Sequence, residues 1–162
     1  MSAPIVVAID GPAASGKSTI SRAVARELNF LYVDTGAMYR AFAWQALQDR
    51  VDVTDAGALV RWLGSVDFRA VAENGAVVLQ LNGRRLEDAW LRTAEVNAAV
   101  SHVAKVPEIR TKAVEAQRGL IALGSLVMEG RDIGTVVFPD TPFKFFIDVD
   151  ADTREKRRAA QG

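Results

Sequence analysis

The sequence contains no cysteine and only one histidine in 162 residues. The absence of cysteine excludes disulfides, zinc–thiolate sites and thiol nucleophiles. No apolar run approaches the length that a membrane-spanning helix needs. The N-terminus also lacks the charged-then-apolar layout of a secretory signal peptide. We therefore expect a cytoplasmic protein that has no membrane partner.

The chain also lacks a net charge, since 20 Lys and Arg residues balance 20 Asp and Glu residues. Without a global positive field, the composition does not point to nucleic acid as a partner. Apolar residues make up 49% of the chain and charged residues 25%, which is typical of a globular domain. The length suffices for one α/β domain with its own core. We expect a monomer in which anion binding depends on local clusters of charge.

One stretch of sequence has the spacing of a phosphate-binding loop, Gly11-x-x-x-x-Gly16-Lys17-Ser18. The apolar run 5–9 precedes it and a helical pattern follows it, which is the strand–loop–helix context that the motif requires. The glycines allow backbone N–H groups to turn inward around anionic oxygens. We expect Lys17 to reach the terminal phosphates of ATP, and the Ser18 hydroxyl to bind Mg²⁺. The predicted nucleotide-binding residues are Gly11, Pro12, Ala13, Ala14, Ser15, Gly16, Lys17, Ser18 and Thr19.

The apolar runs predict an α/β fold, an open parallel sheet with flanking helices. Short β-branched or aromatic runs at 4–10, 30–34, 125–129 and 144–148 read as its strands, with helical patterns between them. Ligands of such sheets bind beyond the carboxyl ends of the strands. We therefore expect the polar residues that follow these strands to converge on one cleft.

Residues 66–86 break this pattern by alternating apolar and polar residues around Asn74-Gly75. That dipeptide between alternating segments is a strong signal for a β-hairpin. We expect a small inserted antiparallel subdomain, separate from the main sheet, at about 65–105. The core of the kinase-like domain then comprises 1–64 and 106–162. A helix is expected over 92–105, and Pro107 is expected to open the next one.

Arginines supply the second half of a phosphoryl-transfer site. Arg40 lies one turn inside the helix after the second strand, and Arg131 follows the strand at 125–129. Guanidinium groups bind phosphate oxygens in bidentate fashion, so these residues are candidates to hold an anionic acceptor. Arg154, Arg157 and Arg158 lie in a C-terminal helical pattern that reads as the start of a mobile lid. We expect Lys17, Arg131 and Arg158 to stabilise the transferring group.

Four motifs together resemble the bacterial cytidylate kinase family, within the P-loop nucleoside monophosphate kinases. They are 11–19, Asp34-Thr-Gly-Ala-Met-Tyr-Arg40, 100–110 and Gly130-Arg-Asp-Ile-Gly-Thr-Val-Val-Phe-Pro-Asp140. The resemblance runs over essentially the whole chain, and the predicted antiparallel insert matches one that is typical of this family. It implies ATP-dependent phosphorylation of CMP and dCMP with Mg²⁺ as cofactor.

The resemblance also implies roles for the acceptor-site residues. Arg40 and Arg131 would hold the monophosphate. The cytosine ring would be bound by Thr35, Ser101, Arg110 and Asp132. An arginine fork with a carboxylate complements the acceptors and the amino donor of cytosine. Uracil presents a carbonyl instead of the amino group, and an unpaired buried polar group costs about 1–3 kcal/mol.

Members of the family continue through a full lid, a further helix and a last strand. The present chain reaches Gly162 as the lid begins at about 154. We therefore expect an incomplete lid, weak nucleotide binding and slow or absent turnover.

Two other functions are alternatives for a chain with a phosphate-binding loop. The same core could serve a P-loop kinase of another small metabolite, such as shikimate. A GTPase switch is disfavoured, because the guanine-binding Asn-Lys-x-Asp and the Asp-x-x-Gly motif do not occur.

Overall fold

A parallel sheet is built around β1 (Val6–Asp10), in which every residue is buried. The computed structural model describes residues 2–161. β1 pairs in parallel with β6 (Leu126–Gly130) on one side and with β7 (Phe143–Phe146) on the other. β6 in turn pairs in parallel with β2 (Leu31–Asp34). Continuous apolar strands of this kind suit a sheet with both faces covered, so the expected fold class is confirmed.

The chain divides into two compact units, each of which is described by itself. The first unit comprises the chain up to Asp34, the short segment Asn74–Ala76 and the chain from Ile121 onward. The second unit comprises Thr35–Glu73 and Val77–Leu120. The first unit therefore contains the parallel strands, and the second contains most of the helices.

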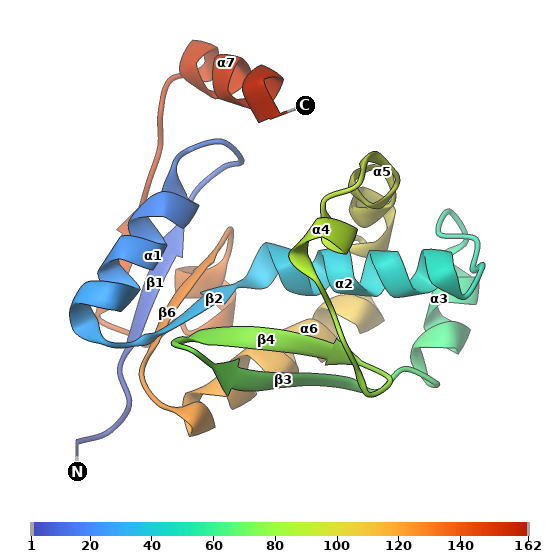
Figure 1. Ribbon diagram of the computed structural model, residues 1–162, viewed down its shortest axis with the longest axis horizontal. Coiled ribbons are helices and arrows are strands. Elements are labelled where there is room, and N and C mark those ends of the chain that lie inside the picture. Colours follow the sequence, from blue (N-terminus) through green and yellow to red (C-terminus); the bar gives the residue numbers. More distant parts are fainter. Residues whose placement is uncertain (1, 162) are drawn as a thin grey trace. The chain divides into compact units, whose positions relative to one another are not determined.

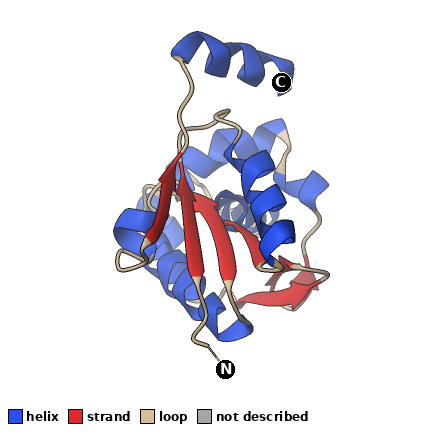
Figure 2. Ribbon diagram, turned by 90° about the vertical axis from the view of Figure 1, so that its left-hand side faces the viewer, coloured by secondary structure: helices blue, strands red, loops and turns tan. Residues whose placement is uncertain are grey.

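In the first unit, α1 (Lys17–Leu28) packs against β1, β2 and β6 (Figure 1). Val7, Ile9, Ala25 and Val127 form a buried cluster beneath this helix. Figure 2 shows the strands side by side in red, with α7 (Ala151–Gln161) beyond their carboxyl ends on an extended segment. No residue of α7 is buried.

The segment after β6 forms a single π-helical turn, η2 (Ile133–Val137), which packs against β1 and β6. A 3₁₀ turn, η1 (Leu120–Leu123), precedes β6. Among residues 2–161, no helix is both long and apolar enough to cross a membrane.

The predicted hairpin at Asn74-Gly75 is confirmed. It joins β3 (Phe68–Glu73) to β4 (Ala76–Leu81), and β5 (Arg84–Arg85) pairs with β4 in antiparallel fashion. Asn74 and Gly75 have φ of 50° and 78°, the left-handed conformation that a two-residue hairpin turn requires.

The expectation that the hairpin lies wholly outside the main sheet is wrong at one position. Ala76 pairs in parallel with Tyr32 of β2, and the Tyr32 N–H donates to the Gly75 carbonyl at 3.1 Å. Local alternation identified the hairpin but carried no information about this long-range strand neighbour.

The helices of the second unit pack chiefly around α2, which contacts α4, α5 and α6. A short helix that was not predicted, α4, ends at Leu91, and the helix expected over 92–105 is confirmed as α5, which follows it. The Thr93 hydroxyl accepts the Val96 N–H at 3.2 Å and so caps the second helix. Pro107 opens α6 as predicted. The helices are α2 (Thr35–Gln48), α3 (Ala56–Leu63), α4 (Asp88–Leu91), α5 (Ala94–Val103) and α6 (Pro107–Gly119).

Candidate active site

The phosphate loop connects β1 to α1, and its backbone conformation and packing require glycine at two positions. Gly16 has φ of +87° and forms the N-cap of α1. A Cβ on Gly11 would lie 2.2 Å from the backbone carbonyl oxygen of Ile147, so a side chain cannot be accommodated there. The two glycines of the motif thus meet two different requirements, backbone conformation at Gly16 and close approach at Gly11.

Lys17 begins α1, and its half-buried side chain folds back over the loop. Its Nζ donates to the Pro12 carbonyl at 3.1 Å. Burial lowers the pKa of Lys17 below its ordinary value of 10.5, and the nearby Glu129 carboxylate opposes that change. Arg131 also lowers the pKa, which shows that its positive charge acts on Lys17. The structure therefore brings two of the predicted cations into one electrostatic environment.

Ser18 faces a buried carboxylate that the sequence patterns did not single out. The Ser18 hydroxyl donates to Glu129 Oε1 at 2.6 Å, and the Tyr32 hydroxyl donates to Oε2 at 2.7 Å. Glu129 is 3% exposed at the end of β6. Burial raises the pKa of Glu129, while the Ser18 and Tyr32 hydrogen bonds act in the opposite direction. Burial also raises the pKa of Tyr32. A lone acidic residue ending an apolar strand was the signal that could have identified Glu129.

Asp10, at the carboxyl end of β1, holds the start of η2. Its Oδ1 accepts the Ile133 N–H and its Oδ2 accepts the Gly134 N–H, each at 2.8 Å. Pattern analysis assigned no role to Asp10. Because η2 directly follows Arg131 and Asp132, this carboxylate fixes the chain next to two predicted acceptor residues.

Four predicted acceptor residues lie in the second unit. Thr35 is 4% exposed at the start of α2, and Arg40 is partly buried one turn further along. Ser101 is exposed on α5. Arg110 is exposed on α6, and its Cζ lies 6.0 Å from the ring centroid of Tyr39, a residue of the same predicted motif as Arg40. Within this unit, the structure thus brings Arg110 beside the motif at 34–40.

A cavity of about 670 Å³ opens beside the phosphate loop in the first unit. Ala14, Ser15, Gly16 and Thr19 line one side, and the apolar side chains of Ile147 and Val149 line another. Ser15 is 3% exposed, and its Oγ has no hydrogen-bond partner within residues 2–161. A buried polar atom of this kind favours a polar ligand at the loop.

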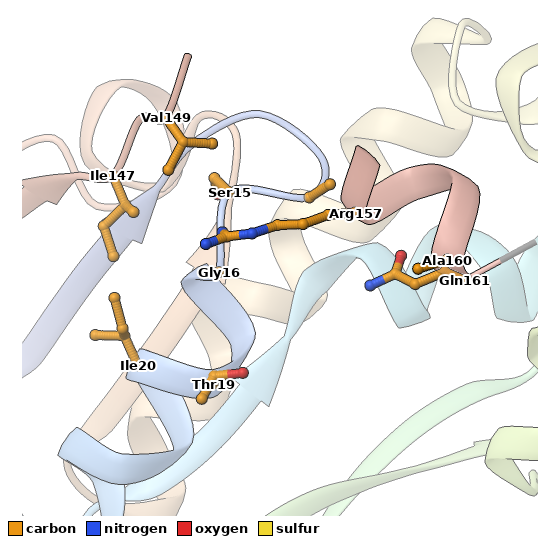
Figure 3. Close-up of a pocket in the computed structure, with 10 residues that line it drawn as sticks. Ser15, Gly16, Thr19, Ile20, Ile147, Val149, Arg157, Ala160 and Gln161 are labelled. Atoms are coloured by element: carbon orange, nitrogen blue, oxygen red, sulfur yellow. The ribbon is translucent and has the colours of Figure 1, made fainter. Parts of the chain in front are cut away.

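Arg157 reaches this cavity from α7. Figure 3 shows its side chain extending toward Ser15 and Gly16. One Nη atom of Arg157 would lie 3.3 Å from a Cβ at Gly16. The other predicted lid arginines are Arg154 and Arg158. One Nη atom of Arg154 lies 3.9 Å from Oδ1 of Asp148, and Arg158 is exposed.

The donor atoms near the loop fit a magnesium ion. The Ser18 hydroxyl donates its hydrogen bond to Glu129, so the lone pairs of its oxygen remain available to a cation. Mg²⁺ prefers oxygen ligands and is usually held by few protein groups together with substrate phosphates and water. In the described part of the chain, no cluster of three or more acidic or histidine side chains could hold a metal by itself.

Comparison with known proteins yields one consistent result. The family model described as cytidylate kinase matches residues 7–162. A cytidylate kinase of Pelotomaculum thermopropionicum is 46% identical over 154 residues, covering 94% of this chain and 67% of that protein. A cytidylate kinase of a Geobacillus species is 43% identical over 157 residues, covering 97% and 70%. One from Streptomyces avermitilis is 40% identical over 159 residues, covering 97% and 68%.

Proposed function

The chain belongs to the cytidylate kinase family, and from this membership we propose that it transfers the terminal phosphoryl group of ATP to CMP. The products are ADP and CDP, and dCMP serves as a second acceptor. The family match over residues 7–162 is the observation that carries this proposal. The phosphate loop with Lys17 and the Ser18–Glu129 pair provides the chemistry that such a reaction needs.

The donor nucleotide binds at residues 11–19. Lys17 leaves its contact with the Pro12 carbonyl and pairs with the terminal phosphates, and Ser18 provides a magnesium ligand. When bound there, Mg²⁺ would help to neutralise the negative charge of the phosphates. The cavity beside the loop supports this assignment, because it combines the loop with an apolar wall and the Arg157 guanidinium. Arg157 is better placed than Arg158, the residue selected from the sequence, to meet the donor.

The acceptor nucleotide binds through two sets of residues. Arg40 and Arg131 hold its phosphate, since guanidinium groups match phosphate oxygens in bidentate geometry. The cytosine ring is bound by Thr35, Ser101, Arg110 and Asp132. The acceptor phosphate is itself the nucleophile, so the reaction needs positioned cations rather than a protein base.

An assay of ADP release with CMP, dCMP, UMP, AMP and shikimate tests this function. We expect CMP and dCMP to give the highest kcat/KM, with UMP and AMP lower and shikimate inactive. Equal rates for all nucleotides, or a preference for shikimate, would contradict the proposal. A shikimate-type kinase is the second candidate, and the family match does not favour it. Calorimetric binding of CMP without turnover would assign acceptor binding but not catalysis to these residues.

The variant Asp132→Asn tests how the base is selected. An amide in place of the carboxylate presents a donor toward the cytosine amino group, so the preference for CMP over UMP should fall. One unpaired buried polar group costs about 1–3 kcal/mol, which corresponds to a loss on the order of 10- to 100-fold. Asp140→Asn is the matched control, because it makes the same change at an exposed position shortly after Asp132. Equal selectivity in both variants would remove Asp132 from the base site.

We also propose that Mg²⁺ is the natural cation of the reaction, and that the protein acts as a monomer in the cytoplasm. Removing divalent cations with EDTA should abolish ADP release, and returning Mg²⁺ should restore it.

A further inference from the structure

Two hydroxyl groups from different elements share the carboxylate of Glu129. Ser18 at the start of α1 donates to Oε1 at 2.6 Å, and Tyr32 of β2 donates to Oε2 at 2.7 Å. Each oxygen of this buried carboxylate therefore has a hydroxyl donor, and the two donors together fix the rotation of the carboxylate plane. Hydrogen bonds to a charged group are among the strong ones in proteins.

The orientation of Ser18 depends on this arrangement. While Oε1 of Glu129 accepts the hydrogen bond of the Ser18 hydroxyl, the lone pairs of the Ser18 oxygen point away from Glu129 and can reach a cation. Without the Tyr32 hydroxyl, Oε2 would lose that hydrogen bond. The carboxylate would then be stabilised by rotating toward other donors. The Ser18 hydroxyl would then lose its acceptor in this position.

Tyr32 is itself held from several directions within the first unit. The Arg22 guanidinium of α1 lies 5.1 Å from the Tyr32 ring centroid. The backbone of Tyr32 pairs with Val127 of β6 and with Ala76 of β4. The phenol ring thus projects from paired strands under a covering cation, so its hydroxyl has little freedom to move away from Glu129.

We propose that Tyr32 is a positioning residue for the magnesium ligand Ser18, and that it acts by orienting the carboxylate of Glu129. The inference rests on the proposed function only in assuming that the loop binds ATP with Mg²⁺. Outer partners of metal ligands set ligand orientation, and their loss typically costs about 10- to 100-fold in metal affinity or activity.

The test compares ATP binding with and without metal in the whole chain. Calorimetry measures the Kd of ATP with excess Mg²⁺ and with EDTA, for the wild type and for Tyr32→Phe, which removes only the hydroxyl. We expect the Kd of Mg-ATP to rise about tenfold. The Kd of metal-free ATP should stay within about twofold of wild type, since Lys17 and the loop amides are untouched. A proportional weakening of both forms, or no change in either, overturns the proposal.

Thr141→Val is the matched control for simple loss of a buried hydroxyl bond. The Thr141 hydroxyl donates to the Val6 carbonyl at 2.5 Å in the same unit but takes no part in the Glu129 network. We expect this variant to lower the thermal midpoint and to leave the Kd of ATP unchanged with and without Mg²⁺. If Thr141→Val mimics Tyr32→Phe in both Kd values, a structural role explains Tyr32 and the proposal is overturned.

A second variant applies if Tyr32→Phe does not fold. Arg22→Gln removes the exposed cation that covers the Tyr32 ring, and a loss confined to Mg-ATP supports the proposal, whereas unchanged binding overturns it. Failure of the proposed function is distinguishable, because these measurements contain no CMP. A wild type that binds Mg-ATP tightly but does not phosphorylate CMP leaves the positioning test intact. A wild-type affinity for ATP that is independent of Mg²⁺ overturns the inference itself.

Discussion

At the scale of single residues, environment decides what each functional group can do. Lys17 and Glu129 carry opposite charges close together, yet burial is the largest influence on the pKa of each. It lowers the pKa of the lysine and raises that of the glutamate, because a charged group loses hydration when it is buried. The negative charge of a polyphosphate would stabilise the protonated form of Lys17 that burial disfavours. The loop is therefore poised for an anion.

The pH dependence of ATP binding tests this view of Lys17. Only the protonated lysine attracts phosphate, so affinity should fall as the pH rises through its lowered pKa. The loss should begin below pH 10.5, the ordinary value for lysine. Calorimetric titrations of ATP from about pH 7 to about pH 11 measure the midpoint of this loss. Lys17→Met should bind weakly at every pH with a flat profile, and a wild-type midpoint at or above 10.5 would contradict the expectation.

At the scale of elements, a side chain at the end of one strand fixes the turn after another. β1 ends at Asp10, and both carboxylate oxygens of Asp10 accept backbone N–H groups at the start of η2. A single π-helical turn is often found at functional sites, and the first N–H groups of a helix have no acceptor within it. Here the carboxylate supplies acceptors that the short turn cannot provide, and Arg131 and Asp132 lie directly before it.

The variant Asp10→Asn should break one side of this contact. Asparagine has one carbonyl oxygen for two N–H donors, and its amide would place a donor against a donor. With Asp10 8% exposed, we expect the free energy of unfolding to fall by about 1–3 kcal/mol. Urea denaturation measures the change. Asp55→Asn is the control, because Asp55 caps α3 at an exposed site where asparagine serves equally well. Equal losses in the two variants would contradict a specific role for Asp10.

At the scale of the whole molecule, the predicted site residues divide between two units. The phosphate loop, Arg131 and Asp132 belong to the first unit, while Thr35 and Arg40 belong to the second, together with Ser101 and Arg110. The predicted donor residues at 11–19 therefore all lie in the first unit, whereas the predicted acceptor residues are found in both units.

The edge strand β7 exposes apolar side chains, which affects how the whole molecule associates. β7 is the last strand in the order of the described sheet, and its phenylalanines Phe143, Phe145 and Phe146 are 44%, 56% and 70% exposed. An exposed apolar edge strand can pair with other chains. Phe145→Thr with Phe146→Thr keeps residues that favour strands, and it should reduce concentration-dependent association in light scattering. Leu123→Thr removes another exposed apolar side chain, which is 44% exposed and lies outside β7, and it should change association little. A larger reduction of association by Leu123→Thr than by the double phenylalanine variant would contradict the prediction.

The sequence by itself determined the features that depend on near neighbours along the chain. The phosphate loop lies between an apolar run and a helical pattern, and its glycine spacing reflects local backbone conformation. The hairpin at Asn74-Gly75 and the helix start at Pro107 are local in the same sense. Four motifs in order also predicted the family, which the comparisons confirmed.

Only the tertiary structure decided which distant residues meet. Glu129 accepts a hydrogen bond from the hydroxyl of Ser18, 111 positions away in the sequence, because the register of β6 against β1 places the end of β6 beside the loop. The contact of Ala76 with β2 likewise depends on strand pairing between segments that are distant in the sequence. The apolar pattern at 144–148 predicted a strand, which the structure forms at Phe143–Phe146, but the exposure of its side chains could not be predicted from that pattern. Periodicity reports the conformation of a segment, whereas burial and pairing depend on which segments fold against it.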